Sequence, residues 1–323
     1  MGCVCQDGPS AMSPPRPNLF LIGAMKSGTT YLSELLGAHP AIFMCTPKEP
    51  CHFVKQSQLR KVWAEGWKRG YGRDLDRYLS LFAGAGATPV IAEASTFYSQ
   101  APLFAGVPER IRAFNPQARL VYVMRDPIER TISQYWHHVR WWGERRPMLR
   151  ALQSEPHYRD VSHYARQLSV YLRRFERERI YVLTCEALAA DSAGELSRLY
   201  GWLGVDPTFR PATLGTPNNV LPQVIEQARG YGLLHRFRRS ELYRHVAPFI
   251  TNRVRTRFAR IATREVRPAE FDTSAVQRYL RPEQQRQSEE LSRLLGRRFP
   301  EWRTLYAHEV SHPEASYALN PTR

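Results

Sequence analysis

The pattern of apolar and polar positions alternates between short strands and amphipathic helices through the first two thirds of the chain. The apolar runs are continuous, which is typical of strands covered on both faces. We expect strands over residues 18–23, 89–93, 119–124 and 179–184. Helical periodicity predicts helices over residues 27–36, 108–114, 128–142, 164–177 and 193–203. This alternation favours a parallel sheet between two layers of helices.

The last third and the two ends of the chain show other patterns. After about residue 225 the pattern becomes almost wholly helical, and the 323 residues show no strong internal domain boundary. Residues 1–17 hold four prolines and few apolar side chains, which predicts a disordered leader. We therefore predict an α/β protein with a P-loop-like three-layer fold, a central parallel sheet flanked by helices, and a helical C-terminal part. One domain is expected over 18–310, followed by a tail over 311–323.

A glycine-rich turn between the first expected strand and the first expected helix is the sharpest motif. It reads Gly-Ala-Met-Lys-Ser-Gly-Thr-Thr over residues 23–30. A helix N-terminus in this position offers free amides and the positive end of a dipole to an anion. The candidate ligands of that anion are Lys26, Ser27, Gly28, Thr29 and Thr30. The usual nucleoside-triphosphate loop has a lysine where Thr29 stands. Because no later strand ends in a convincing magnesium-binding aspartate either, metal-assisted phosphoryl transfer is disfavoured and no metal is expected.

A second candidate nucleotide element follows the third expected strand. Arg125 emerges at the carboxyl end of that strand, where open α/β sheets bind ligands. Ser133 lies eight residues later, about two helical turns away. Arginine forms charge-assisted and bidentate bonds with phosphate. Together the two elements resemble those of sulfotransferases that use 3′-phosphoadenosine-5′-phosphosulfate (PAPS). The resemblance implies that residues 26–30 bind the 5′-phosphosulfate, that Arg125 and Ser133 bind the 3′-phosphate, and that 3′-phosphoadenosine-5′-phosphate (PAP) is the product.

The segment over residues 47–53 resembles the K-E-P-H-F-F segment of heparan-sulfate-type and similar bacterial sulfotransferases. The match places Glu49 at the family's proposed general base, and a cysteine stands at the family's usual histidine. Sulfuryl transfer needs a base for the acceptor proton and a cation, here Lys26, for the leaving phosphate. Glu49 is the predicted base, and a surface ion pair with its lysine neighbour is the alternative. His52 is the rival base, because histidine does this work in cytosolic small-molecule sulfotransferases; its alternative is a packed side chain.

Residues 93–98, Glu-Ala-Ser-Thr-Phe-Tyr, resemble the family's E-K-S-x-x-Y segment, which lines the acceptor cleft. The resemblance implies that Ser95 and Tyr98 contact the acceptor together with Glu49, and ordinary loop packing is the alternative. Segments over 179–188 and 199–205 also resemble the family. The resemblance therefore spans about residues 18–210, and the C-terminal third matches only in outline.

Positive charge is in excess and is concentrated late in the chain. The formal net charge is +16, and residues 229–264 hold ten arginines against one acid. A helix is predicted from residue 249 to about 265, with a cationic stripe formed by Arg253, Arg257, Arg260 and Arg264. The stripe is either a solvated flank or a binding surface for an acidic glycan or an anionic membrane. We find no recognised nucleic-acid module, so no nucleic-acid partner is expected.

Cysteine usage and hydropathy set the expected compartment. The five cysteines are odd in number and lack zinc-ligand spacing, so a reducing cytoplasm is the default. No stretch approaches the roughly 20 apolar residues of a membrane span. We expect a cytoplasmic protein, with peripheral contact to a membrane left open.

The function predicted from these motifs is PAPS-dependent transfer of a sulfuryl group to a hydroxyl or amine by in-line displacement. A carbohydrate, a glycolipid or another small-molecule secondary metabolite would serve as the acceptor. Two other classes remain open: a P-loop kinase-like phosphotransferase, and a non-catalytic protein that binds polyanions or membranes. The sequence does not name the acceptor or the oligomeric state.

Overall fold

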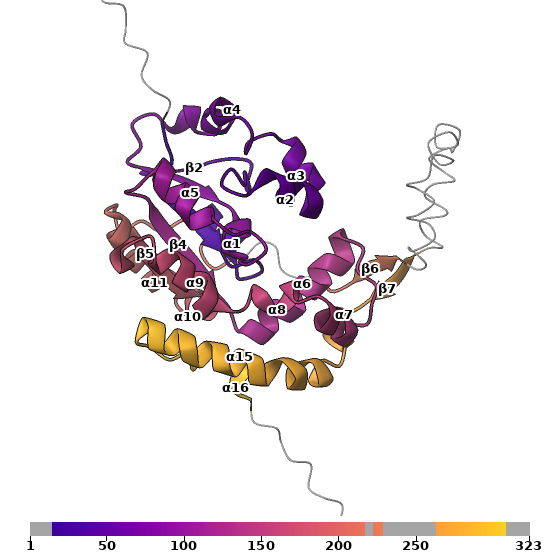
Figure 1. Cartoon of the computed structure of the whole chain (residues 1–323). Helices are drawn as coiled ribbons and strands as arrows, with labels where there is room; N and C mark the ends of the chain where they lie inside the picture. The colour runs from indigo at the N-terminus through magenta and orange to yellow at the C-terminus, as the bar shows by residue number, and fades with distance from the viewer. Residues whose placement is uncertain (1–14, 217–221, 229–262, 308–323) are drawn as a thin grey trace, which may run out of the picture.

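A central sheet of five parallel strands organises the molecule in the computed structural model, which describes residues 15–216, 222–228 and 263–307. The strand order is β2-β3-β1-β4-β5 (Figure 1). The strands are β1 (Leu19–Gly23), β2 (Ile42–Met44), β3 (Val90–Ala94), β4 (Arg119–Met124) and β5 (Ile180–Thr184). Four of them confirm the expected strands. The sequence pattern did not indicate β2, because three residues at a sheet edge are too few to show a period.

Alternate side chains of the central strands enter two separate cores. Phe20 and Ile22 of β1 face one core, and Leu19 and Leu21 face the other. Helices α5 (Val107–Phe114), α6 (Pro127–Trp141), α9 (Tyr164–Leu172) and α15 (Ser274–Leu295) pack on the first face. Helices α1 (Thr29–Gly37), α10 (Cys185–Ala190) and α11 (Ser192–Leu203) pack on the second. The predicted three-layer α/β fold is therefore confirmed.

The helices before the last third include all those that the sequence predicted. They are α1 (Thr29–Gly37), α2 (Gln56–Val62), α3 (Ala64–Lys68), α4 (Leu75–Leu79), α5 (Val107–Phe114), α6 (Pro127–Trp141), α7 (Met148–Ser154), α8 (His157–Asp160), α9 (Tyr164–Leu172), α10 (Cys185–Ala190) and α11 (Ser192–Leu203). The start of α6 illustrates the local rules. The Asp126 side chain accepts hydrogen bonds from the amides of Ile128 and Glu129, and Pro127 occupies the first turn.

The sequence pattern predicted an almost wholly helical last third, but the structure also contains two strands there. Strands β6 (Ile225–Ala228) and β7 (Thr263–Val266) pair antiparallel. Residues 263–265 therefore belong to a strand and not to the end of the expected helix, because they pair with a segment some forty residues away that local periodicity does not reveal. Arg253, Arg257 and Arg260 lie outside the described residues, and Arg264 lies in β7. Most of the expected leader, 1–14, and the whole expected tail, 311–323, also lie outside them.

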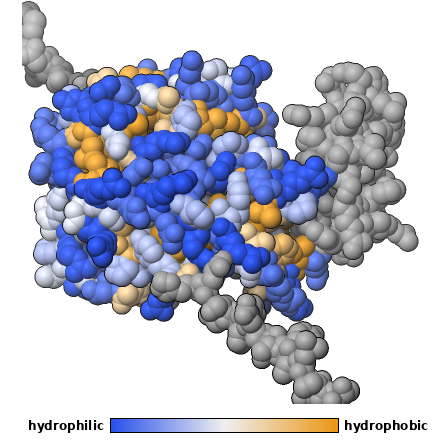
Figure 2. Space-filling view, turned by 60° about the horizontal axis from the view of Figure 1, so that its bottom comes forward, coloured by the Kyte–Doolittle hydropathy of each residue, from blue (hydrophilic) through white to orange (hydrophobic). Residues whose placement is uncertain are grey.

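Helix α15 (Ser274–Leu295) crosses the first face of the domain and is followed by α16 (Arg303–Tyr306). Its inward positions include Val276, Leu280 and Leu291. Figure 2 shows the molecule with its α15 side turned toward the viewer. This surface is mainly hydrophilic, with separate apolar areas. Within the described ranges, no helix has both the length and the apolar composition to cross a bilayer.

Candidate active site

The candidate phosphate loop lies at the carboxyl end of the central strand β1. Gly28 precedes α1 with a φ of 83°, and no side chain within the described residues caps the first amides of this helix. Gly23 has a φ of 147°, and a Cβ added there would lie 1.9 Å from the Ser99 hydroxyl oxygen. Both positions therefore require glycine. The amides and dipole of α1 remain open to an anion.

Cations gather around Lys26 in this loop. Burial lowers the pKa of Lys26, and the charges of Arg125, Arg140, Lys48 and Arg130 lower it further. An anion placed among these side chains would relieve their mutual repulsion, because each would gain an opposite charge. The electrostatics of the loop therefore suit phosphate and sulfate groups.

Lys48 reaches this loop from the segment that follows β2. Its ammonium nitrogen donates hydrogen bonds of 3.0 Å to the hydroxyl oxygens of Thr29 and Thr30. The ammonium group therefore lies on the loop and not in a surface ion pair with Glu49. Each threonine hydroxyl still has its own proton to donate to an anion.

The second predicted nucleotide element lies at the junction of β4 and α6. The Tyr164 hydroxyl donates to the carbonyl of Arg125 at 2.7 Å, which fixes the backbone there. The Arg125 guanidinium forms a partly exposed ion pair with Glu129 at 3.3 Å. Ser133 is 9% exposed on α6. Arg125 appears in the electrostatic surroundings of Lys26, so the structure brings the two predicted elements together.

Helix α6 presents two further residues to the loop, His137 and Arg140. With Ser133 they follow a spacing of four and three, which places all three on one helical face. Burial lowers the pKa of His137 to about 4, and the charges of Lys26 and Arg140 contribute. The imidazole is therefore neutral at pH 7 and offers a hydrogen-bonding group without further charge.

Arg130 lies fully buried beneath the phosphate loop. Its guanidinium donates to the side chain of Gln134 at 2.7 Å and to the Met25 carbonyl at 3.5 Å. It also donates to the Tyr158 carbonyl and to the Ser162 hydroxyl. Arg130 thus joins the loop to α6 and to the segment before α9, and it adds to the positive potential around Lys26.

Glu49 lies beyond Lys48, at the edge of the sheet. One carboxylate oxygen accepts a hydrogen bond from the Thr96 amide at 2.8 Å, and the other accepts one from the Thr96 hydroxyl at 3.0 Å. Burial raises the pKa of Glu49, while Lys48 and the Thr96 bonds lower it. A carboxylate oxygen has two lone pairs, so each can still accept a further hydrogen bond. The group therefore suits general-base chemistry.

His52 occupies an aromatic cluster. Its ring stacks on Tyr78 with centroids 4.0 Å apart and meets Phe53 edge-on. The Nδ1–H donates to the Tyr71 carbonyl, which fixes the tautomer. Burial lowers the pKa of His52. These contacts match the alternative of a packed histidine.

Ser95 and Tyr98 also point inward. Ser95 is fully buried and Tyr98 is 2% exposed. The Ser95 hydroxyl accepts a hydrogen bond from the Cys51 amide, and the Tyr98 hydroxyl accepts one from the Phe53 amide. The observed contacts of both side chains are therefore within the protein, and the alternative of loop packing describes them.

Three charged residues, Lys48, Arg130 and Glu93, were not predicted from the sequence as functional residues. Each of them nevertheless leaves a signal in the sequence. Lys48 is the lysine of the K-E pair beside the predicted base. Arg130 stands five residues after Arg125, at a buried position of helix α6. Glu93 is an acid at the end of an apolar strand and is 0% exposed. A charged residue within a buried pattern marks positions worth inspection.

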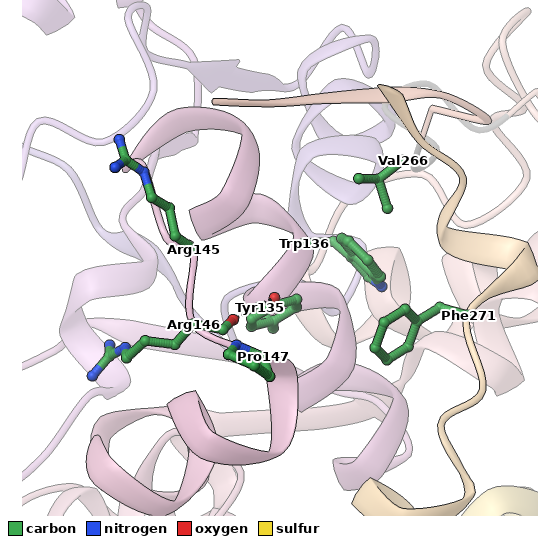
Figure 3. A pocket seen from close by; sticks show the side chains of 7 residues that line it. All are labelled: Tyr135, Trp136, Arg145, Arg146, Pro147, Val266 and Phe271. Carbon is green, nitrogen blue, oxygen red and sulfur yellow. Dashed lines mark hydrogen bonds between the residues drawn. The ribbon is translucent and has the colours of Figure 1, made fainter. Parts of the chain in front are cut away.

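A separate hollow of about 260 Å³ lies on another side of α6 (Figure 3). Its lining residues are Tyr135, Trp136, Arg145, Arg146, Pro147, Val266 and Phe271. The close view shows the side chains of Arg145 and Arg146 extending away from Trp136 and Phe271. Neither the phosphate loop nor Glu49 lines this hollow, so it is distinct from the site described above.

A parallel sheet with a cationic phosphate loop and a partly buried carboxylate beside it defines a nucleotide-dependent group transferase. The profile of the Sulfotransferase family matches residues 17–210, so the chain belongs to this family. This membership confirms the resemblance drawn from the two nucleotide elements and from the segment around Glu49.

Individual relatives agree with this assignment. The membrane-associated sulfotransferase kil1 of Dictyostelium discoideum is 35% identical over 127 residues, covering 39% of this chain and 24% of that protein. Heparan sulfate glucosamine 3-O-sulfotransferase 6 of Mus musculus is 30% identical over 210 residues, covering 61% of this chain and 56% of that protein. The chain thus spans about half, or less, of these relatives. A sulfotransferase structure from Alicyclobacillus acidocaldarius matches with a TM-score of 0.63 and 25% identity, covering 90% of this chain and 99% of the other.

Proposed function

We propose that this chain transfers a sulfuryl group from PAPS to a hydroxyl or amine of a carbohydrate, glycolipid or secondary-metabolite acceptor. The observation that carries the proposal is the placement of Lys48 and Glu49. Lys48 contacts the phosphate loop at Thr29 and Thr30, and the next residue is a partly buried carboxylate held by Thr96. An anion-binding group and a base are therefore one residue apart.

The residues of the loop and of α6 fit a nucleotide that carries phosphate groups at both its 5′ and its 3′ position. The amides at the start of α1 with Lys26 and Lys48 would hold the 5′ end, and Arg125 with Ser133 would hold the 3′-phosphate. Support comes from the uncapped helix and from the cations grouped around Lys26. PAPS supplies the activated sulfuryl group.

The chemistry assigned to the chain is proton removal and charge stabilisation. Glu49 takes the proton of the acceptor hydroxyl as the new oxygen–sulfur bond forms, and burial strengthens it as a base. Lys26 and Lys48 stabilise the negative charge that develops on the leaving phosphate.

Calorimetric titration with PAP and with ADP tests the nucleotide assignment. We expect PAP to bind at least tenfold more tightly, and Arg125→Ala to remove that preference. Arg198→Ala is the matched control, because Arg198 is an exposed arginine on α11 that pairs with Glu195. Equal affinity for the two nucleotides, or magnesium-dependent ATP binding stronger than PAP binding, would contradict the proposal.

Turnover with labelled PAPS against a panel of acceptors tests the reaction itself. Glu49→Gln should lose turnover and retain PAP binding. If His52→Gln lost turnover instead, the base would be His52. Adsorption to polyanions or vesicles that persists in Lys26→Ala, without any turnover in the parent chain, would favour a non-catalytic binding protein.

A further inference from the structure

The turn that carries Glu49 has an unusual backbone conformation. Glu49 has a φ of 60° and Cys51 a φ of 55°. Neither residue is glycine, so each occupies the left-handed region at a cost of about 1–2 kcal/mol. Such a conformation persists only where the surrounding structure fixes it.

Alternate amides of this turn are held by one neighbouring segment. The Glu49 amide donates to the Ala94 carbonyl at 2.9 Å. The Cys51 amide donates to the Ser95 hydroxyl at 3.2 Å. The Phe53 amide donates to the Tyr98 hydroxyl at 3.4 Å. Two of the three acceptors are side chains, so the conformation of the turn depends on the identity of these residues.

The same segment also holds the Glu49 carboxylate. Thr96 lies between Ser95 and Tyr98 and donates both its amide and its hydroxyl to the two carboxylate oxygens. The backbone and the carboxylate of Glu49 are therefore fixed from a single short stretch that follows β3.

Further contacts hold the side chain and the backbone of Tyr98. Its hydroxyl accepts from the Phe53 amide, so its own proton remains available to another acceptor. The carboxyl of Glu93 is fully buried, and the hydroxyls of Tyr78 and Tyr98 are its polar neighbours. The Tyr171 hydroxyl donates to the Tyr98 carbonyl at 2.8 Å, which fixes the backbone of Tyr98.

We propose that Ser95 and Tyr98 are positioning residues that hold the 49–53 turn. They keep the Glu49 carboxylate on Thr96 and facing the site. The inference rests on the proposed role of Glu49 as the base. It assigns to Ser95 and Tyr98 an action through Glu49 in place of direct contact with the acceptor.

The experiment measures Glu49 directly, without an acceptor. The chain is labelled with ¹³C at the glutamate side-chain carboxyls, and the Glu49 signal is assigned by its loss in Glu49→Gln. The charged and titratable groups near Glu49 include Lys48, Cys51, Glu93 and Arg69, whose guanidinium donates to the Lys48 carbonyl, and none of these is replaced in the test variants. A looser turn weakens the Thr96 hydrogen bonds that lower the pKa of Glu49. We therefore expect Ser95→Ala and Tyr98→Phe each to raise that pKa by about half a unit to one unit.

Ser288→Ala is the matched control, because it removes a buried hydroxyl from α15, away from the turn. It should leave the pKa of Glu49 unchanged. On an acceptor found by screening, the two test variants should lose about tenfold in kcat and keep the affinity for PAP.

An unchanged Glu49 pKa and unchanged kcat in both variants would overturn the proposal. A raised acceptor KM with unchanged kcat and pKa would also overturn it, because it would assign the two side chains to acceptor contact. Should Tyr98→Phe fail to fold, Ser95→Ala decides alone. If Glu49→Gln retains turnover, the proposed base fails, whereas the titration still reports whether the turn is held as we propose.

Discussion

Both oxygens of the Glu49 carboxylate accept hydrogen bonds from Thr96, and the backbone amide of Phe97 also lowers the pKa of this carboxyl. The Thr96 amide contact is 2.8 Å and the Thr96 hydroxyl contact is 3.0 Å. Burial favours the protonated form of Glu49, whereas these two bonds favour the carboxylate. The basicity of Glu49 is therefore set by a balance in which one side chain can be changed without altering the carboxyl itself.

Thr96→Val should move the acid limb of the pH–activity profile to higher pH. The substitution removes the hydroxyl bond to the carboxylate and keeps the amide bond, so the pKa of Glu49 rises by about one unit. Activity on the acid side of the profile should then fall more than activity on its alkaline side. The conservative Thr96→Ser retains the hydroxyl and should keep the original profile. Profiles of kcat that coincide for Thr96→Val and the parent chain would refute this role.

Lys48→Ala should weaken PAP binding and lower kcat. The change removes the ammonium group that lies on Thr29 and Thr30, and the loss expected for one charge-assisted contact is about tenfold or more in affinity. Lys68→Ala is the control, because Lys68 is an exposed lysine paired with Glu65. Calorimetry and turnover measure the two effects. Equal behaviour of the two variants would show that Lys48 has no special role.

Arg130→Met should destabilise the fold by about 3 kcal/mol, since it leaves buried partners such as Gln134 and the Tyr158 carbonyl without their donor. Urea unfolding measures this change. The exposed control Arg198→Met should lie within about 0.5 kcal/mol of the parent chain. A loss of PAP affinity should accompany the destabilisation, because Arg130 also contacts the loop at Met25. Stability equal to that of the control would mean that the buried network contributes little.

Glu93→Gln should change how stability depends on pH. Burial raises the pKa of Glu93 to about 8 from its ordinary value of 4.5. The folded state therefore keeps a proton that the unfolded state loses, and this group's contribution to stability is full below pH 4.5 and is lost as the pH rises to 8.

The glutamine stays neutral at every pH. The free energy of unfolding of Glu93→Gln should therefore rise relative to that of the parent chain between these pH values, by up to about 5 kcal/mol, and should rise no further above pH 8. Urea unfolding over a pH series measures the gap. The exposed Glu178→Gln should show none. A constant gap for Glu93→Gln would indicate that Glu93 ionises normally in the folded state.

Gly23→Ala should abolish nucleotide binding or folding of the loop. A Cβ would lie 1.9 Å from the Ser99 hydroxyl, and the φ of 147° is unfavourable for alanine. Gly201→Ala is the matched control, because its Cβ would meet no atom within 4 Å and the residue lies in helix α11. That control should be neutral or slightly stabilising. PAP titration and thermal unfolding compare the two. Normal PAP binding by Gly23→Ala would show that the loop can rearrange.

Local patterns predicted most of the sheet but not its margins. Four strands are continuous apolar runs, whereas β2 has three residues and the pairing of β6 with β7 joins segments far apart in the sequence. For the site, motif spacing indicated the phosphate loop and Arg125, and the resemblance of residues 47–53 to a family segment indicated Glu49. The direction of the Lys48 side chain and the burial of Arg130 depend on tertiary packing, which the spacing of residues along the sequence does not encode. The inward orientation of Ser95 and Tyr98 depends on the short turn after β3.

The order of the strands separates two halves of the proposed reaction in space. The donor-binding segments follow β1 and β4, which are adjacent near the centre of the sheet, and both are enclosed by neighbouring strands. The Glu49 segment follows β2 at the margin, and helices α2, α3 and α4 continue from it. Marginal loops tolerate insertion and exchange far better than enclosed ones. The fold can therefore accommodate new acceptors by remodelling this border, while the nucleotide site stays as it is.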